Sequence, residues 1–346
     1  MNNLKDYTIR LCRKDEIVSL QHFIKQSWHG EHIFVQDKSV LDWQHLEGEK
    51  YNFVVAFHEP TQTFHGVLGI IAPSFYASGY IQKHDDIWLA IWKVNKAKAQ
   101  SNSLGMDLLE FVKEQYSPRT ISAIGINQQV ALLYRLMGFR IAKMNHVFIL
   151  NPEKDTFSIA HIQNRVSSES TEALANIAEI AADALPTIKP AIAQWGRFEH
   201  YERYLQGRFA EHPQYHYRFF SVTHDQSVEA VFVARKITVK GESCLRIVDW
   251  SAKPGFNLHL LEAMQALLVK ENSEYIDMIH YGMQEDEMMW LGGQTCTEDN
   301  YVPHLFEPFV ENRVEVQIAY LSDSDFLCFK GDSDLDRPNQ LINHTV

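Results

Sequence analysis

The feature that most constrains the fold of this 346-residue chain is the stretch formed by residues 124–139. It predicts the end of a strand, a helix that starts at Asn127, and a Gly138-Phe139 step where the helix stops and another strand starts. An asparagine at the helix start satisfies free backbone amides, and Ala131 leaves room for a ligand against the helix. Tyr134 follows about two turns later and lies on roughly the same face. An ordinary amphipathic helix between two strands shows the same periodicity, so the stretch gains meaning only from a partner upstream.

A second segment, about twenty residues upstream, is such a partner. Residues 86–94 are rich in β-branched and aromatic side chains and predict a buried strand. After a polar turn, residues 103–112 have helical apolar spacing. Backbone amides at such a junction favour an anion, because unpaired N–H groups and the helix dipole both attract negative charge. A plain strand-to-helix connection is the competing interpretation.

Together the two segments resemble the paired motifs of the GNAT superfamily, the acyl-coenzyme A dependent N-acetyltransferases. Members carry Gln or Arg, two spacers, Gly, one spacer, then Gly or Ala at this junction. Here Gln100-Ser-Asn-Ser103-Leu-Gly105 matches, except that Ser103 replaces the middle glycine. The β-carbon of Ser103 stands where a phosphate must approach closely, so a loop of different shape is expected. The resemblance implies that acyl-coenzyme A is bound by Trp92, Lys93, Val94, Gln100, Ser101, Ser103, Leu104, Gly105, Met106, Asn127, Ala131 and Tyr134.

Length and composition predict a soluble enzyme of two domains. A chain of this length, 45% hydrophobic, is too long for one typical core. The net charge of −12, without a basic stripe, argues against nucleic-acid binding. No apolar run is long enough for a membrane span, and the first residues lack the apolar core of a signal peptide, so the cytoplasm is the expected compartment. The four cysteines and 17 histidines lack metal-ligand spacing, and no metal is expected.

The second half repeats the order of the first, which favours an internal duplication. A strand at 244–250, a helix at 258–271 and a strand at 275–281 repeat the order of residues 86–139. Further helices are expected at 170–184 and 285–291. Any α/β domain can show this order, which is the alternative interpretation.

The expected fold class is therefore α/β, with two GNAT-like domains that are each a mixed β-sheet flanked by helices. Residues 1–151, closed by a strand at 147–150, would bind acyl-coenzyme A. Residues 152–346 would form a degenerate GNAT-like domain that contributes acceptor binding, because residues 253–256 contain nothing like the loop at 100–105.

Three further stretches resemble a narrower group, bacterial tandem-GNAT N-acyltransferases that act on nucleotide-linked amino sugars in surface-polysaccharide synthesis. They lie at residues 32–44, 302–309 and 329–339. The resemblance implies an acetyl or 3-hydroxybutyryl donor and a dTDP-linked 3-amino-3,6-dideoxyhexose acceptor. The protein itself is expected to be a monomer or a dimer. Residues expected to bind the acceptor, as stacking aromatic or charged groups, are His32, Asp42, Trp43, Trp250, Tyr281, His304, Glu307, Asp332, Asp336 and Arg337. For the alternating aspartates at 332–336, a calcium-like site and a solvated acidic turn are the alternatives.

The mechanism follows from what amide formation requires. An amine attacks a thioester only when unprotonated, so the site must accept a proton and stabilise an oxyanion. By resemblance, a backbone N–H at residues 92–94 meets the oxyanion and Tyr134 protonates the leaving thiolate. Asp249 is the preferred base, because it would end the central strand of the second copy and face a cleft between the domains. The other candidates are Asp85, Asp86, His280, His304, Glu307 and a water chain.

Two other functions stay open. The first is a binding module: if Ser103 in the phosphate loop prevents catalysis, the tandem domains would hold acyl-coenzyme A without turning it over. A tandem aminoacyl or peptide N-acyltransferase is the second alternative.

Overall fold

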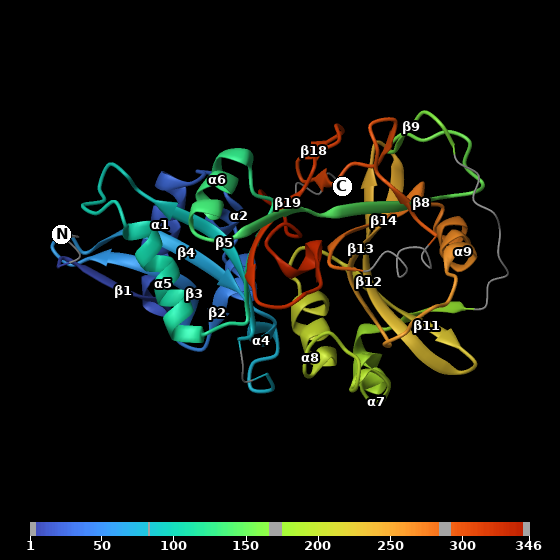
Figure 1. The fold of residues 1–346 in the computed structure, drawn as a ribbon, viewed down its shortest axis with the longest axis horizontal. Helices are drawn as coiled ribbons and strands as arrows, with labels where there is room; N and C mark the ends of the chain where they lie inside the picture. Colours follow the sequence, from blue (N-terminus) through green and yellow to red (C-terminus); the bar gives the residue numbers. More distant parts are fainter. Residues whose placement is uncertain (1–4, 82–83, 166–174, 284–291, 342–346) are drawn as a thin grey trace.

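Two mixed α/β units make up the molecule, and their sheets lie toward opposite ends of an elongated shape (Figure 1). This arrangement is that of a computed structural model, which describes residues 5–81, 84–165, 175–283 and 292–341. Each sheet contains both parallel and antiparallel pairs and carries helices. The prediction of two mixed sheets flanked by helices is confirmed.

The first sheet has the strand order β1-β3-β4-β5-β6-β19-β7, with β2 beside β3. Its strands are β1 (Tyr7–Arg13), β2 (Leu46–Glu47), β3 (Lys50–His58), β4 (Thr63–Ile71), β5 (Asp86–Val94), β6 (Thr120–Ile124), β7 (Arg140–Lys143) and β19 (Gln317–Ser322). Only β5 and β6 pair in parallel among these strands, and helix α5 (Leu104–Tyr116) connects them.

Helices cover both faces of this sheet. On one face lie α5 and α6 (Gln128–Leu136), and α5 buries Leu104, Leu108 and Val112 at a spacing of four residues. Burying each such side chain contributes roughly 1.5–3 kcal/mol. The other face carries α1 (Ile17–Ser27), α2 (Ile33–Gln36) and α3 (Lys38–His45). The short element η1 (Lys14–Glu16) precedes α1, and α4 (Pro73–Tyr76) follows β4.

The second sheet has the order β10-β11-β12-β13-β14-β8-β15, and β20 also pairs with β14. Its strands are β10 (Asn176–Ile180), β11 (Tyr217–His224), β12 (Ser227–Val239), β13 (Glu242–Ala252), β14 (Tyr275–Tyr281), β8 (Asn145–Leu150), β15 (Gln294–Thr295) and β20 (Cys328–Phe329). Its parallel pair, β13 and β14, is connected through α9 (Leu261–Glu271). The other elements are η2 (Ala182–Ile188), α7 (Lys189–Ile192), α8 (Tyr201–Leu205), η3 (Gln206–Ala210), η4 (Lys330–Asp332), and the short pairs β9 (His161–Ile162) with β16 (Asn300–Tyr301) and β17 (Leu305–Phe306) with β18 (Phe309–Val310).

The helix expected at 170–184 is wrong in its described part, because residues 176–180 form the strand β10. Ile177 and Ile180 have helical spacing, but they enter two different cores on opposite faces of the strand. The helix expected at 285–291 lies outside the described residues.

The two units exchange one strand each. The strand at 147–150 was expected to close the first unit, and that is wrong: as β8 it pairs with β14, with Leu150 opposite Tyr275. In return β19 lies between β6 and β7, with Ile318 opposite both Ile124 and Ala142. The sequence pattern identifies a strand but not its partner. The domain boundary at 151 stays a prediction.

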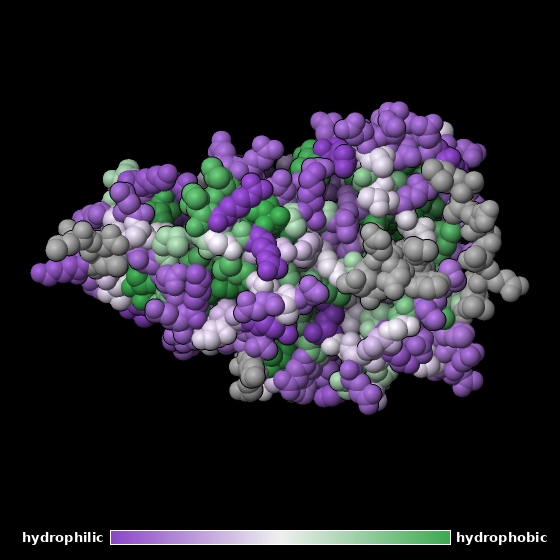
Figure 2. Space-filling model, viewed as in Figure 1, coloured by the Kyte–Doolittle hydropathy of each residue, from purple (hydrophilic) through white to green (hydrophobic). Residues whose placement is uncertain are grey.

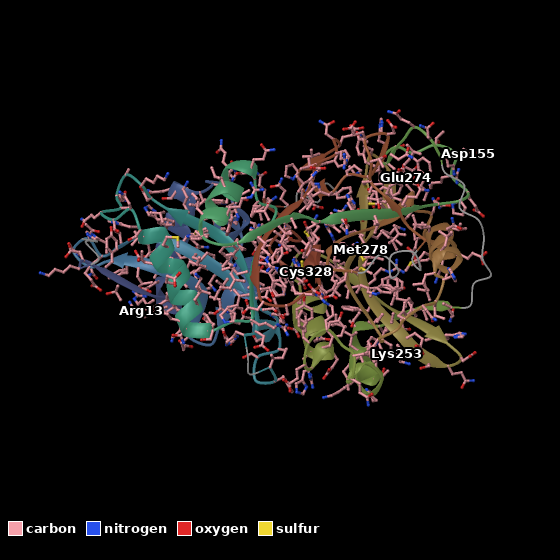
Figure 3. All side chains as sticks on the ribbon, in the orientation of Figure 1. Arg13, Asp155, Lys253, Glu274, Met278 and Cys328 are labelled. Carbon is pink, nitrogen blue, oxygen red and sulfur yellow. The ribbon has the colours of Figure 1, made fainter. Side chains whose placement is uncertain are left out.

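A shared core lies where the units meet. It joins Trp88 and Ile124 of the first sheet with Ile318 of the exchanged strand and with Ile279 and Cys328 of the second. Figure 3 shows Cys328 near the middle of the long axis. Leu335, of the C-terminal tail, packs against the same core. The tail of the chain is therefore part of the junction between the units.

Candidate functional site

The parallel strands of the first unit separate part-way along their length. Their register runs from Asp86 opposite Thr120 to Trp88 opposite Ser122 and ends there, although β5 continues to Val94. A bulge at residues 90–91, opposite Gly69 of β4, bends β5 at this point. Among the described residues, no other strand pairs with residues 89–94 on the β6 side. The edge of β5 therefore borders an opening between two strands.

The second unit has the same opening, but the chain itself fills it. The register of β13 and β14 also covers only three residue pairs, ending with Ile247 opposite Met278, and β13 also has a bulge next to this point. There β20 pairs with β14, and a β-carbon on Gly331 would stand only 2.4 Å from the carbonyl oxygen of Val248. Only the first unit thus retains an opening that its own backbone does not occupy, within the described chain.

Aromatic rings line the α5 face of the opening. The ring of Tyr134 lies 5.7 Å from that of Trp92 and 4.8 Å from that of Phe139, between centroids. Tyr134 is 4% exposed. Burial, together with the negative charge of Asp334, raises the pKa of the Tyr134 phenol, so its proton is retained at neutral pH.

The helix that carries Tyr134 begins as expected. Asn127 is the N-cap of α6, and its Oδ1 accepts a hydrogen bond of 2.9 Å from the backbone N–H of Val130. Ala131 is buried next to the core. The other side of α6 exposes apolar side chains, namely Val130, Leu132, Leu133 and Leu136, and Figure 2 shows apolar surface over this part of the molecule.

The loop before α5 is held by its own side chains. Ser101 and Ser103 share a hydroxyl contact of 2.8 Å, and the Ser103 hydroxyl donates to Asp107 at 2.9 Å. The N–H of Asp107 donates to the Ser103 carbonyl, so the amides of residues 104–106 have no partner within the helix. These amides suit an anion, whereas the carboxylate of Asp107 in the same turn opposes one.

Solved structures resemble this arrangement. No protein-family model and no curated protein matches the sequence. A GCN5-related N-acetyltransferase from Anabaena variabilis ATCC 29413 superposes with a TM-score of 0.53 at 13% identity, over 91% of this chain and 72% of that one. A conserved protein of unknown function from Enterococcus faecalis V583, described as a probable N-acyltransferase, gives 0.53 at 8% identity, over 90% and 72%.

The chain has the GNAT fold. The strand opening, the capped helix α6 and the loop before α5 lie in one unit of that fold, where the resemblance in sequence predicted a coenzyme site. At such low identities the shared property is the fold, and the reaction is argued below from the site itself.

Asp249 does not face a cleft in this GNAT fold, and that part of the prediction is wrong. Its side chain is fully buried, accepts a hydrogen bond of 2.7 Å from the Tyr201 hydroxyl and lies 2.9 Å from Arg197. Arg197 also pairs with Asp332 at 2.6 Å. Burial raises the pKa of the Asp249 carboxyl against the opposing charge of Arg197. The geometry therefore lends no support to Asp249 as a base that reaches a substrate.

The other tail residues expected at the acceptor site are also bonded within the protein. Asp336 is buried and accepts a hydrogen bond of 2.7 Å from the Tyr217 hydroxyl. Arg337 is buried, lies 3.2 Å from Nε2 of His32, and stacks its guanidinium 4.6 Å from the Phe34 ring centroid. These contacts attach the tail to α2 of the first unit. Their roles in substrate binding stay predictions.

The remaining expected acceptor residues are spread over both units. Trp43 donates to the Gly207 carbonyl at 2.9 Å, and Glu307 accepts from the Tyr215 hydroxyl at 2.7 Å. Three more have partners of their own: Asp42 accepts from the Tyr51 hydroxyl, the His304 carbonyl accepts from Lys330, and the Tyr281 hydroxyl bonds that of Tyr320. Trp250 stacks on Phe232 in the core of the second sheet. The structure does not gather these six residues into one pocket.

Two residues near the opening, Asp107 and Leu335, were missed from the sequence, and Asp334 was considered only as one of the alternating aspartates. The Asp334 and Leu335 side chains are partly exposed, whereas Asp332 and Asp336 on either side are buried. The only signal in the sequence was that aspartates occupy every second position of the tail. This spacing does not show which of their side chains is exposed.

Within the described ranges, no group of three or more His, Cys, Asp or Glu side chains is placed to hold a metal ion. Among the described helices, none has the length and apolarity needed to cross a membrane. Two surface hollows, of about 240 and 370 Å³, are not lined by Trp92, Tyr134 or Asp334. The strand opening is therefore defined by backbone geometry and its wall residues rather than by either of these hollows.

Proposed function

We propose that the protein is an acyl-coenzyme A dependent N-acyltransferase that transfers an acyl group directly to an amine in a ternary complex. The observation that carries this proposal is the early end of pairing between β5 and β6, beside an Asn-capped helix with a buried tyrosine. The equivalent opening in the second unit is filled by the chain. The non-catalytic alternative lacks this support, because holding a coenzyme does not require a buried, protonated phenol.

The chemistry of the donor fits the opening. Buried backbone N–H and C=O groups need partners, and the free edge of β5 offers them to an extended ligand. The pantetheine arm of coenzyme A is extended and contains two amides, so it can lie along this edge in the manner of a strand. The unpaired amides of residues 104–106 would meet its phosphates. Acyl-coenzyme A supplies the activated thioester.

The protein groups then have separate tasks. A backbone N–H of residues 92–94 stabilises the negative oxygen that develops on the thioester carbonyl. Tyr134, buried and protonated, donates a proton to the sulfur as it leaves. Asp107 accepts the hydrogen bond of the Ser103 hydroxyl and so fixes the loop before α5.

For the acceptor, the proposal is a nucleotide-linked amino sugar, most specifically a dTDP-3-amino-3,6-dideoxyhexose, with an acetyl or 3-hydroxybutyryl donor. Support comes from the sequence resemblance of residues 32–44, 302–309 and 329–339. Parts of the first and last of these stretches contact each other through His32 and Arg337. An aminoacyl or peptide amine is the second candidate.

Thiol release tests the proposal. The protein is incubated with acetyl-coenzyme A and, in separate reactions, with dTDP-linked amino sugars, free amino acids and short peptides. Release with the amino sugars alone is the expected result. Release with amino acids or peptides alone refutes the sugar acceptor but keeps the reaction class. Calorimetric binding of acetyl-coenzyme A without release from any acceptor refutes the reaction class and favours a binding module.

A tyrosine variant tests the site within the same assay. Tyr134→Phe removes the proton donor but keeps the ring packing against Trp92, so binding of acetyl-coenzyme A is expected to stay within about twofold. The turnover number is expected to fall about 10²-fold or more. Val18→Ala, at an exposed position on α1, is the matched control and leaves both values unchanged.

A further inference from the structure

The C-terminal tail packs beside the opening between β5 and β6, on the face of the sheet opposite α5. Leu335 packs into the junction core that contains Trp88, Ala90 and Ile124, which come from the two separating strands. A β-carbon on Gly125, directly after β6, would stand 2.8 Å from Leu335 Cδ2. The residue before it, Asp334, lies close enough to Tyr134 for its charge to act on that phenol.

The tail is fixed on both sides of Asp334. Arg208 donates to the carbonyls of Gly331 and Ser333, both at 2.9 Å. After Asp334, the carbonyl of Asn339 accepts from the N–H of Ile33 at 2.9 Å, and Arg337 contacts His32. A side chain supported in this way keeps its position when a substrate binds.

Asp334 differs from the neighbouring aspartates in what its carboxylate can reach. Asp332 is bound to Arg197 and Asp336 to Tyr217, and both are buried. The Asp334 side chain is 18% exposed, and its Oδ2 lies 3.3 Å from Arg337. Its Oδ1 accepts no hydrogen bond from the described part of the chain. One carboxylate oxygen is thus free to meet a ligand.

The surroundings of Asp334 are polar and incompletely bonded. The charge of Asp334 acts on two phenols, Tyr134 and Tyr76, and raises the pKa of each in addition to the effect of burial. Within the described structure, the buried hydroxyl of Tyr76 and the buried indole N–H of Trp88 have no hydrogen-bond partner. Unpaired buried polar atoms in such a wall are expected to bond a ligand.

We propose that Asp334 is the catalytic residue that binds the acceptor's ammonium group and accepts its proton. This assignment rests on the proposed N-acyltransferase function. Asp334 takes one proton from the ammonium and passes it to solvent. The free amine then forms the C–N bond, the C–S bond breaks, and Tyr134 protonates the thiolate. The second N–H proton goes to Asp334 and from there restores Tyr134, so one proton is released per amide formed.

Asp334→Asn tests this assignment by comparing acceptors that differ in the pKa of their amine. For an ordinary primary amine at pH 7, thiol release is expected to fall about 10²-fold or more, and the residual rate is expected to rise about tenfold per pH unit. For hydroxylamine, which is largely unprotonated at pH 7, the loss is expected to be less than tenfold. Asp334→Glu should recover part of the rate. Asp323→Asn, at an exposed position upstream, is the control and should behave as the wild type.

The outcomes separate the two proposals. If the wild type transfers to amines and Asp334→Asn keeps the same rate and pH profile, Asp334 is not the base but the function stands. If Asp334→Asn loses the same fraction of its rate with the primary amine and with hydroxylamine, Asp334 is again not the base. Removal of a proton from the amine would then not be the step that the variant slows. If the wild type releases no thiol with any amine, the function fails and the base with it. Binding of acetyl-coenzyme A within twofold of the wild type shows that the variant is folded.

Discussion

Leu335 lies so close to Gly125 that a β-carbon there would meet its side chain at 2.8, 3.0 and 3.2 Å. Gly125 also has a φ of +77°, a conformation that costs other residues about 1–2 kcal/mol. Gly125→Ala therefore combines backbone strain with displacement of the tail. We expect a loss of about 2–4 kcal/mol in the free energy of unfolding, measured with urea.

Gly138→Ala separates these two effects. Gly138 has a φ of +86° but open space around a β-carbon, so its loss should be only the backbone cost. Adding Leu335→Ala to Gly125→Ala should relieve the steric part, giving a double variant less destabilised than the sum of the single ones. Equal losses for the two glycine variants would show that the tail does not press on Gly125.

The strand exchange predicts that residues 1–151 do not fold alone. Without β19, the strands β6 and β7 lose the partner between them, and β8 has no second sheet to join. Unpaired edges and an apolar β8 favour aggregation. We expect the fragment to be insoluble or to lack near-ultraviolet circular dichroism, and co-expression with residues 152–346 to restore soluble protein.

The exchange also shows how far a sequence can predict such a fold. Residues 145–150 and 275–281 have strand patterns that local composition reveals, and Asn127 is an N-cap because its side chain acts within its own turn. The pairing of β19 with β6 joins residues nearly 200 positions apart, and no local pattern encodes it.

The candidate site also combines residues that a local motif can predict with residues whose position depends on the tertiary fold. Tyr134 could be predicted as a site residue because its motif is local, whereas the position of Asp334 depends on where a distant tail packs against the sheet. The sequence alone does not show which of Asp249, Asp332 and Asp334 is available to a substrate. In the folded protein, Asp249 and Asp332 are buried and paired with Arg197.

Arg197 predicts a large cost of breaking a buried ion pair. It is 5% exposed in its side chain and bridges Asp249 and Asp332, which are fully buried. Arg197→Met leaves two buried carboxylates without their cation, so we expect a loss of about 3–5 kcal/mol in the free energy of unfolding. Lys143→Met, which breaks an exposed pair with Glu315, should cost less than about 1 kcal/mol. Similar losses in urea unfolding of the two variants would contradict the buried pairing.

Lys330 predicts a pH dependence of stability. Its side chain is buried, its Nζ donates to the His304 carbonyl at 2.7 Å, and burial, with nearby Arg246, lowers its pKa to about 7 from an ordinary value of 10.5. Between these two values the unfolded chain binds a proton that the folded protein has released. The free energy of unfolding therefore rises with pH in this window, by at most ~1.4 kcal/mol per unit from this group.

Lys330→Met removes this titration while keeping a similar volume. We expect the variant to be more stable than the wild type at pH 7 and its advantage to shrink between pH 7 and 9. The buried cysteines and tyrosines also titrate in alkali, but they are common to both proteins and cancel in the difference. Urea unfolding of both proteins at pH 6, 7, 8 and 9 measures the difference in their free energies of unfolding. A difference that stays constant from pH 7 to 9 would mean that Lys330 keeps its proton in the folded protein.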